Sequence, residues 1–476
     1  MDNWRHLTLG LRLKLSAHPE LDVTQASSET KSLVALGFLL DPNNPEAGDQ
    51  EILDGLLERF DSLEQLLQAT SALGGRWAII ATHGRAQYLF TDAFGLRQVF
   101  YTLPELAGDL YVMSEPAAAA ALLSLPVDDE ARAYMDSKEF RINSEYKWPA
   151  ASSPFRGISR LLPNHYLDLG NGACRRFWPE SRLSTVTLEE GTEKIAGILT
   201  GLLHAAANRF ELAIAVTCGI DSRVVLAACR DIKEKVSFVT LRQWHMADDS
   251  PDITIPQTLL MQLGLKHDVI NAPVTTTPEF AQIFKSSTYL AHEHYGPDAE
   301  AILGRYRRRK VAVTGSGGEV GRCQFRAELP FFDRKRVTAA YLSQLEIGAI
   351  NGFAMKHFGM WLDDAGPGEG INKLDLFEWE QGCGSWLATT QLEFDMAWKD
   401  IFTPFNCRDL VIAMLSVPTK YRKGPNYPLF RCLIQKLWTE VQGAPINPHR
   451  KRSAVSQYLH EAGLVARHVL QRFRYR

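Results

Sequence analysis

A short apolar segment that runs into a polar turn constrains this chain more than any other feature of its sequence. Residues 212–216 read Leu-Ala-Ile-Ala-Val, which is typical of a buried strand, and an apolar stretch typical of a helix follows Ser222. The turn between them holds Gly219 and Asp221. A strand ending in small residues at a helix N-terminus exposes backbone N–H groups and the positive end of the helix dipole, which bind phosphate. No Lys-Ser/Thr pair follows a glycine here, so the turn is not a Walker A loop.

From about residue 185 the sequence predicts helices that alternate with single apolar strands. A helix over 193–210 precedes the strand just described, and further strands are expected at 236–240, 267–270 and 311–314. Strands separated by helices predict βαβ units and a parallel sheet, with ligand sites at the carboxyl ends of the strands. Beyond about residue 333 the chain is expected to be mostly helical.

The first 180 or so residues have a different pattern, in which short apolar strands alternate with Gly, Pro and Asp turns. Residues 77–82 and 87–91 are expected to pair as a hairpin across His83-Gly84-Arg85. A strand is expected at 98–102, and a second hairpin is expected to join 165–169 to 176–178. This half is therefore predicted to be rich in antiparallel sheet.

A second glycine-rich loop follows the expected strand at 311–314. It reads Thr314-Gly315-Ser316-Gly317-Gly318-Glu319-Val320-Gly321-Arg322 and lies about 95 residues after the first loop. Successive glycines bring backbone amides close to an anion. The sequence thus places two candidate anion-binding loops after two strands of one sheet.

The two loops together resemble those of a known family of ATP pyrophosphatases. The run Thr217-Cys218-Gly219-Ile220-Asp221-Ser222 resembles the Ser-Gly-Gly-x-Asp-Ser loop, and the second loop resembles one that ends in Gly-Gly/Ala-Asp-Glu. The pair is similar to the synthetase domain of class B asparagine synthetases, β-lactam synthetases and lasso-peptide cyclases. The resemblance implies an α/β fold with a glutaminase-like (Ntn-type) β-sandwich domain over 1–182. A doubly wound parallel-sheet synthetase domain with a helical end would cover 183–476.

The resemblance also assigns roles to residues of the two loops. Asp221 and Glu319 are implied to hold Mg²⁺, with Glu319 at the family's Asp position and Val320 at its Glu position. Backbone atoms of Thr240 and Leu241 are implied to bind adenine. ATP and its pyrophosphate are implied to lie on the residues that remain of the two loops, namely Thr217, Gly219, Asp221, Ser222, Gly315, Ser316 and Gly317.

Two further residues are implied to be catalytic. The segment 396–405 resembles the family's helix that reads Met-Ala, Glu, Arg, Pro-Phe, with Asp400 at the Glu position and Phe402 in place of the Arg. The stretch 445–451 resembles the one that delivers a catalytic lysine, here Lys451. Lys423 is a rival for that role.

The N-terminal half resembles the family's glutaminase domain but departs from it at the nucleophile. Its landmarks are Gly75-Arg76-Trp77-Ala78, Asp92-Ala93-Phe94-Gly95 and residues 157–165. Glutaminase chemistry in that family uses an N-terminal cysteine, whereas this sequence opens with Met1-Asp2 and its first cysteine is Cys174. Without that thiolate no thioester with glutamine can form. We therefore expect this half to be a structural remnant.

Composition excludes several other classes of function. The formal net charge of -3 gives no reason to expect a nucleic-acid partner, and no run of about 18 apolar residues predicts a membrane span. The seven cysteines are scattered, with no Cys-x-x-Cys pair. That usage argues against a disulfide framework or a zinc ribbon and favours a reducing, cytoplasmic location.

The resemblance of the two loops implies an ATP-dependent carbon-nitrogen ligase that forms AMP and pyrophosphate. The expected substrate is a carboxylate-bearing small molecule or peptide, attacked after adenylation by an amine of the substrate or by ammonia. A peptide or small-molecule cyclase is favoured, because an internal amine needs no glutamine. A peptide cyclase would be expected to have a precursor peptide and its protease as partners. Ammonia-dependent asparagine synthesis, amidation of a sugar acid and an inactive nucleotide-binding scaffold stay open as alternatives. The oligomeric state is open too.

The missing thiolate leads to a first prediction. Purified protein should release neither ammonia nor glutamate from glutamine, because the sequence has no cysteine before Cys174. Incubation with glutamine and a coupled glutamate assay measures this directly. A glutaminase activity that one substitution within residues 1–180 abolishes would contradict it.

Overall fold

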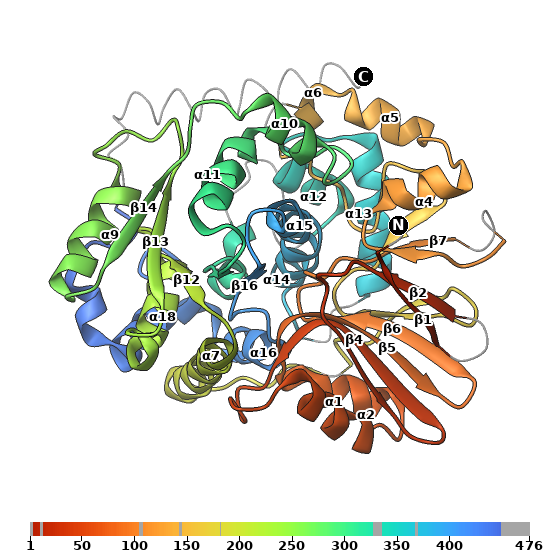
Figure 1. Ribbon diagram of the computed structural model, residues 1–476, viewed down its shortest axis with the longest axis horizontal. Coiled ribbons are helices and arrows are strands. Elements are labelled where there is room, and N and C mark those ends of the chain that lie inside the picture. The colour runs from red at the N-terminus through yellow and green to blue at the C-terminus, as the bar shows by residue number, and fades with distance from the viewer. Residues whose placement is uncertain are drawn as a thin grey trace.

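Two kinds of β-sheet occupy the two halves of the chain, in the order that the sequence predicts. The computed structural model describes residues 3–9, 13–103, 108–141, 145–180, 182–326, 336–366 and 370–448. Antiparallel sheets lie in the N-terminal half and a parallel sheet lies in the C-terminal half (Figure 1). The mixed α/β class is therefore confirmed, while the boundary expected near residue 182 stays a prediction.

The largest N-terminal sheet is antiparallel and has the strand order β11-β10-β6-β5-β4-β3. The expected hairpin at 77–91 is confirmed, since β5 pairs with β6 across Gly84 and Arg85. The second expected hairpin is also present, between β10 and β11. The strands are β3 (Val23–Ser27), β4 (Lys31–Leu40), β5 (Gly74–His83), β6 (Ala86–Thr91), β10 (His165–Asp168) and β11 (Cys174–Arg176).

Alternating side chains of this sheet point into two separate cores, as the two-residue period of a strand requires. Leu33 and Ile79 lie on one face, packed against helices α1 (Asp49–Glu58) and α2 (Leu63–Ala69). Val34 and Ile80 lie on the other face. That face packs on a second sheet, β7 (Phe100–Thr102), β8 (Val112–Met113) and β9 (Ile158–Arg160), and on the hairpin β1 (Arg5–Leu9) and β2 (Leu13–Ala17). Helices α4 (Pro116–Leu123), α5 (Asp129–Met135) and α6 (Lys138–Arg141) follow β8.

The C-terminal sheet is parallel throughout, with the strand order β14-β13-β12-β15-β16. The chain leaves β12 to build one side of the sheet and later returns to build the other, so β12 and β15 flank a topological switch point, where ligands of such sheets bind. The strands are β12 (Leu212–Ala215), β13 (Ser237–Arg242), β14 (His267–Asn271), β15 (Val311–Val313) and β16 (Asp400–Phe402).

Helices cover both faces of the parallel sheet. Ile214 and Val313 point to one face and share a core with α7 (Leu188–Arg209), α8 (Ile220–Ala228), α9 (Pro251–Gln262), α16 (Arg408–Ser416) and α18 (Pro428–Leu437). Ala213 and Ala312 point to the other face, under α10 (Pro278–Lys285) and α11 (Gly296–Tyr306). None of the helices that the structure describes is both long and apolar enough to cross a bilayer.

The segment 396–405, expected to be helical, is instead partly a strand. Residues 400–402 form β16, which pairs in parallel with β15. Ile401 and Phe402 are buried on opposite faces of the sheet, and Pro404 follows at once, which disfavours helix. The rest of the chain beyond residue 336 is mostly helical where it is described, as expected, and includes α12 (Ala339–Ile347), α13 (Gly352–Ala365) and α17 (Thr419–Arg422).

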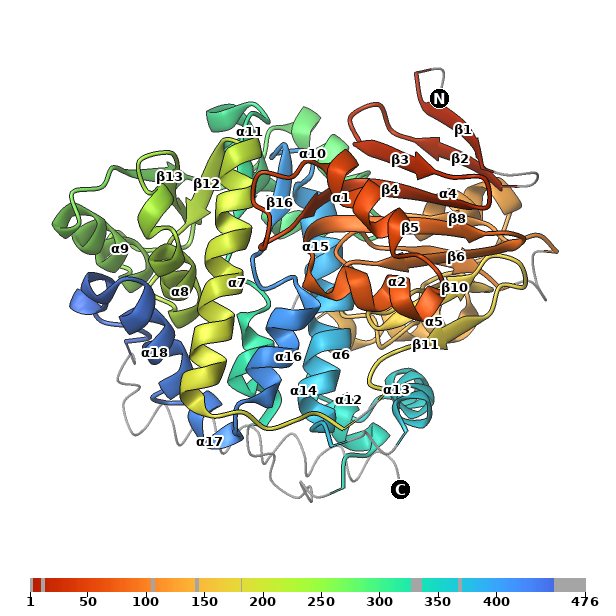
Figure 2. The same cartoon turned by 90° about the horizontal axis from the view of Figure 1, so that it is seen from below.

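One long helical segment lies between the two kinds of sheet in both views (Figures 1 and 2). It runs from α14 (Lys373–Phe377) through a π-helix (Glu378–Leu387) to α15 (Ala388–Phe394). Its buried polar groups bond to the N-terminal half. The Trp379 indole donates to the Ala93 carbonyl at 2.6 Å, and Gln381 bonds both the Ala150 amide at 2.7 Å and the Trp148 carbonyl at 2.9 Å. The segment thus fixes the two halves against each other.

A buried charge network also joins the halves. The Arg76 guanidinium of β5, 1% exposed, contacts Asp395 at 3.0 Å and Asp400 at 2.8 Å. Arg97 contacts Asp400 at 2.6 Å. Burial favours the neutral form of Arg76, but the two carboxylates outweigh that effect and raise its pKa. The charges therefore depend on one another for compensation.

We expect Arg76→Met to destabilise the protein by about 3 kcal/mol, because it leaves two partly buried carboxylates, Asp395 and Asp400, with Arg97 alone. Chemical denaturation of the wild type and the variant measures this difference. Arg85→Met, in the exposed turn between β5 and β6, is the matched control and should change stability by less than about 0.5 kcal/mol. Equal losses in the two variants would show that the network does not hold the halves together.

Candidate nucleotide site

The first loop links the carboxyl end of β12 to the N-terminus of α8, as the sequence predicts. The Ser222 hydroxyl holds its shape, since it accepts a hydrogen bond from the Thr217 amide at 3.1 Å and lies 3.1 Å from the Gly219 carbonyl. Gly219 has an extended backbone and precedes the first helical residue. The loop therefore aims the first amides of α8 at the edge of the sheet, the arrangement that binds anions.

The loop amides have side-chain acceptors in this structure. The Gly219 amide donates to Thr217 Oγ1 within the loop at 3.1 Å. Two acceptors come from outside it, because the Cys218 amide donates to Asp252 Oδ1 and the Ile220 amide donates to Asn447 Oδ1, each at 3.1 Å. A phosphate oxygen on these two amides would have to replace a carboxylate and a carboxamide oxygen.

The second loop packs directly on the first, and its glycines permit this approach. A Cβ atom on Gly315 would lie 2.7 Å from the Ser222 amide nitrogen, and one on Gly318 would lie 2.6 Å from Asp221 Oδ1. Gly317 has a φ of +90°, and a Cβ atom there would lie 2.2 Å from the Phe94 ring. Any larger residue would push the loops apart, so the glycines at these positions have a steric cause.

The approach of the loops brings together the two carboxylates expected to hold Mg²⁺. The Arg322 guanidinium lies between them, 2.7 Å from Asp221 Oδ2 and 3.3 Å from Glu319 Oε1. Asp221 Oδ1 is buried and has no hydrogen-bond partner. Burial, and next the negative charge of Glu319, raise the pKa of Asp221 despite the opposing effect of Arg322. The pair therefore lacks positive charge on the side of Asp221 Oδ1.

The residues present fit Mg²⁺ that is shared with a nucleotide. Mg²⁺ is usually held by one or two carboxylates together with substrate phosphates and water. Asp221 and Glu319 supply two such carboxylates, and the unpartnered Asp221 oxygen gives the ion a ligand. No cluster of three or more His, Cys, Asp or Glu side chains suited to a metal occurs in the described part of the chain. Val320 is fully buried and adds no ligand.

The residues expected to bind adenine lie at the same edge of the sheet. β12 pairs with β13 only as far as Val239, so the backbone of Thr240 and Leu241 continues past the end of β12. The Thr240 hydroxyl is buried and donates to the Val216 carbonyl at 2.6 Å. Backbone groups of successive strand residues point to opposite edges, so the backbone of Thr240 faces β14 and that of Leu241 faces the side that β12 leaves open to a ligand.

The structure does not bring Asp400 to this site. β15 and β16 are parallel, and their carboxyl ends meet the loops where the Thr314 amide donates to the Phe402 carbonyl at 3.0 Å. Asp400 begins β16, so it lies at the opposite edge of the sheet, among the charges of Arg76 and Arg97. The expectation that Asp400 acts in catalysis here is corrected accordingly, since its position makes it part of the contact between the halves.

The expected catalytic Lys451 lies outside the described residues, but the chain just before it reaches the loop. Asn447 donates its amide to the Cys218 carbonyl at 2.9 Å as well as accepting from Ile220. Arg223 of α8, fully buried, donates to the carbonyls of Val441 and Ala444 at 2.9 and 3.1 Å. Residues 441–447 are thus tied to the first loop.

Sequence reasoning missed Arg322, Asp252 and Asn447 as members of the site. Arg322 ends the second loop, and its spacing of three residues from Glu319 is the signal that could have paired them. Asp252 and Asn447 reach the loop through tertiary contacts, for which the sequence has no local signal.

The first cysteine of the chain, Cys174, is not part of the candidate nucleotide site. Cys174 is in β11, and burial raises the pKa of its thiol to about 11. All seven cysteines are free. The Cys174 thiol is therefore neutral at physiological pH and is not an activated nucleophile.

Comparison with known proteins places few limits on this site. No protein-family model matches the chain, and no curated protein matches it either. Among solved structures it is similar to the allosteric regulatory enzyme of purine biosynthesis, with 14% identity and a TM-score of 0.22, over 56% of this chain and 59% of that one. It is also similar to glutamine phosphoribosylpyrophosphate amidotransferase from B. subtilis complexed with ADP and GMP, with 14% identity, a TM-score of 0.22, and coverage of 73% and 77%. The assignment of the site therefore rests on its own geometry.

The two carboxylates lead to a binding prediction. Mg²⁺-ATP at 100 times its dissociation constant should stabilise the wild type by about 2.7 kcal/mol. Asp221→Asn and Glu319→Gln each remove a charge expected to face the metal, so the gain at the same ligand concentration should fall to about 1.4 kcal/mol for a tenfold loss of affinity and to about 0.4 kcal/mol for a hundredfold loss. Thermal unfolding with and without Mg²⁺-ATP measures the gain.

Asp231→Asn is the matched control, since Asp231 is an exposed carboxylate in the turn that follows α8. It should keep the full gain. If both loop variants are stabilised by Mg²⁺-ATP as much as the control, the metal assignment is wrong.

Proposed function

We propose that this protein is an enzyme, an ATP-dependent carbon-nitrogen ligase that releases AMP and pyrophosphate. One observation supports this above all others. Two glycine-containing loops, which follow the neighbouring parallel strands β12 and β15, meet so closely that Asp221 and Glu319 share Arg322. A loop that serves only to connect elements does not need an unpartnered buried carboxylate oxygen at a helix N-terminus.

Adenylation needs groups that orient the phosphates and groups that supply positive charge, and the two loops contain both kinds. A carboxylate that attacks the α-phosphorus of ATP approaches a group of like charge, so positive charge must stabilise the transition state. Mg²⁺ would neutralise the phosphates when bound. The first loop, through Thr217, Gly219 and Ser222, and the second, through residues 315–317, would orient the pyrophosphate. Arg322 adds a protein cation at the same place.

The properties of the N-terminal half guide our proposal for the acid and the amine that the enzyme joins. The one cysteine of residues 1–182 is Cys174, whose thiol has a raised pKa, so we propose an amine of the substrate itself as the nucleophile for the acyl-adenylate. This favours a cyclase that acts on a carboxylate-bearing small molecule or on a peptide. A peptide cyclase would have a precursor peptide and its protease as partners. Free ammonia as the amine, with asparagine or a sugar amide as the product, is the second candidate.

An inactive nucleotide-binding scaffold is a further candidate, favoured by specific observations. The amides of the first loop already have acceptors in Asp252 and Asn447, and Val320 takes the place of an acidic residue. A scaffold would bind ATP without turning it over.

The architecture and location belong to the same proposal. We propose a glutaminase-like β-sandwich domain without its nucleophile over residues 1–182 and a synthetase domain over 183–476. The free cysteines fit a cytoplasmic enzyme. The parallel sheet and its loops are the part that we assign to catalysis.

Lys451 separates the ligase from the scaffold. It lies four residues after Asn447, which contacts the first loop. An ammonium there would stabilise the adenylate and the tetrahedral intermediate, so Lys451→Ala should lower product formation by about 10²–10³-fold while Mg²⁺-ATP still binds. Lys451→Arg should restore little activity, because a planar guanidinium does not replace a compact ammonium.

Exchange of labelled pyrophosphate into ATP, screened over candidate acids, provides the measurement before the substrate is known. Formation of AMP rather than ADP is the second readout. Tight ATP binding without exchange for any acid would replace the ligase with the scaffold. Full activity of Lys451→Ala would keep the ligase and move the catalytic cation, with Lys423 the next residue to test.

A further inference from the structure

A segment near the C-terminal end of the described chain covers part of the candidate nucleotide site. We call residues 441–447 the C-terminal strap. Asn447 of the strap donates its backbone amide to the Cys218 carbonyl at 2.9 Å, and its side-chain Oδ1 accepts from the Ile220 amide at 3.1 Å. Ile220 is the first residue of α8. The strap therefore occupies one of the helix amides that would otherwise face an anion.

The acceptor on the Ile220 amide is a side chain from a distant part of the chain. The Gly219 amide finds its acceptor within the loop, in Thr217, whereas Ile220 and Asn447 are 227 positions apart. Asn447 has a φ of +47°, in the left-handed region that asparagine tolerates better than most residues. An oxygen 3.1 Å from the first amide of a helix lies where an oxygen of a bound anion would lie.

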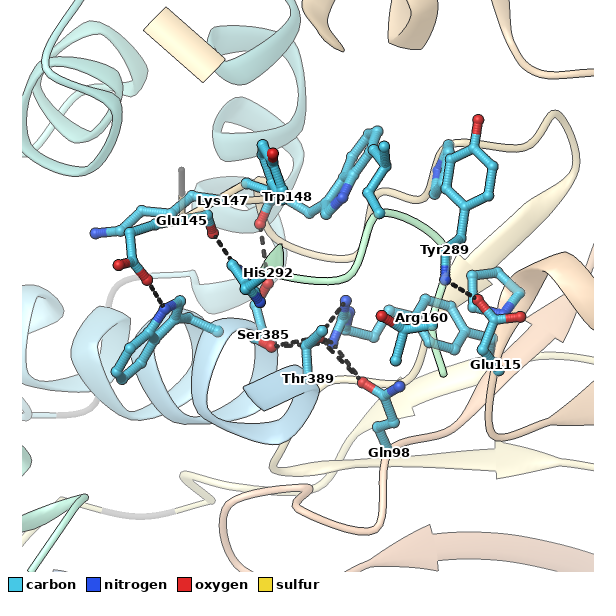
Figure 3. Close-up of a pocket in the computed structure, with 17 residues that line it drawn as sticks. Gln98, Glu115, Glu145, Lys147, Trp148, Arg160, Tyr289, His292, Ser385 and Thr389 are labelled. Carbon is cyan, nitrogen blue, oxygen red and sulfur yellow. Dashed lines mark hydrogen bonds between the residues drawn. The ribbon is translucent and has the colours of Figure 1, made fainter. Parts of the chain in front are cut away.

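Buried arginines of this protein tie neighbouring segments together by donating to backbone carbonyls. Arg160 donates to the Gly384 and Ser385 carbonyls at 3.2 and 3.3 Å, and Figure 3 shows its side chain beside Thr389. The cavity at this place measures about 30 Å³, which is room for one or two water molecules. The guanidinium of Arg160 therefore serves to join the two halves of the molecule.

Arg223 anchors the strap in the same way. It lies on α8, about one turn after Ile220, and is fully buried. Its guanidinium donates to the carbonyls of Val441, Ala444 and Pro445 at 2.9, 3.1 and 3.1 Å. These bonds do not involve the side chain of Asn447. The carboxamide can therefore leave the Ile220 amide while residues 441–445 stay attached to α8.

We propose that Asn447 is an internal competitor of the nucleotide phosphates. Its carboxamide caps the Ile220 amide in the free protein and is displaced when a phosphate oxygen binds there. The proposal rests on the candidate nucleotide site but not on the ligase chemistry proposed for it. Lys451 follows Asn447 by four residues. Displacement of Asn447 thus links the binding of phosphate to the stretch of chain that leads to the expected catalytic lysine.

The sign of a change in affinity separates this role from a structural one. If Asn447 competes with the phosphates, removal of its carboxamide strengthens their binding, because one internal hydrogen bond no longer has to be broken. If Asn447 only holds the loop in a shape that binds phosphate, the same removal weakens binding. Asn447→Gly is the variant of choice, since glycine adopts a positive φ readily and keeps the backbone amide that bonds Cys218.

Calorimetric titration of the full-length protein with Mg²⁺-ATP and with Mg²⁺-pyrophosphate provides the measurement. Asn447→Gly should bind both ligands about 2–10-fold more tightly than the wild type. Asn447→Asp should bind both at least about tenfold more weakly, because a carboxylate is a stronger acceptor for the Ile220 amide and repels the phosphates. Asn43→Gly, at an exposed asparagine of the N-terminal half, is the matched control and should bind as the wild type does.

The results that would overturn the proposal also show whether the nucleotide site itself stands. If Asn447→Gly binds both ligands no more tightly than the wild type, or Asn447→Asp binds them as tightly, Asn447 does not compete with the phosphates, and the nucleotide site is unaffected. If neither the wild type nor Asn447→Gly binds Mg²⁺-ATP or Mg²⁺-pyrophosphate at millimolar concentration, the loops do not form a nucleotide site, and the proposed function fails together with the role of Asn447.

Discussion

The close packing of the second glycine loop on the first turn of α8 is the contact on which the candidate site depends. Gly315 and Gly318 leave room for Asp221 and the backbone of Ser222, at distances that no Cβ atom tolerates. The packing buries Asp221 Oδ1, which has no hydrogen-bond partner, and brings Asp221 and Glu319 close enough to contact the same Arg322 guanidinium. Because the glycines of the second loop carry no side chains, the two loops can approach closely. The approach leaves an excess of negative charge that a metal ion bound with a triphosphate would neutralise.

The halves of the molecule are held in register by buried polar contacts rather than by apolar packing alone. The helical segment 373–394 bonds to the N-terminal half through Trp379 and Gln381, and the charges of Arg76 and Asp400 add a second junction. The Phe94 ring of the N-terminal half lies against Gly317 of the second loop. The N-terminal half therefore contributes to the shape of the site.

Local patterns in the sequence predicted the elements and loops of the site, but they did not predict the contacts between distant segments. The period of the apolar residues indicated β12, β13 and β15, and the small residues after them indicated both loops. Resemblance placed Asp400 in the site, but three residues of strand at 400–402 carry it to the far edge of the sheet. The acceptors Asp252 and Asn447 reach the first loop through tertiary packing, which has no local signature in the sequence.

The central claim is that the two loops form one nucleotide site, and a crystal structure with Mg²⁺ and α,β-methylene-ATP tests it most directly. The account predicts the phosphates between the loops, the metal in contact with Asp221 and Glu319, and the Asn447 carboxamide displaced from the Ile220 amide. Adenine should lie along the backbone of Thr240 and Leu241. A nucleotide bound elsewhere, or phosphates that leave Asn447 on the Ile220 amide and no metal near Asp221, would contradict the claim.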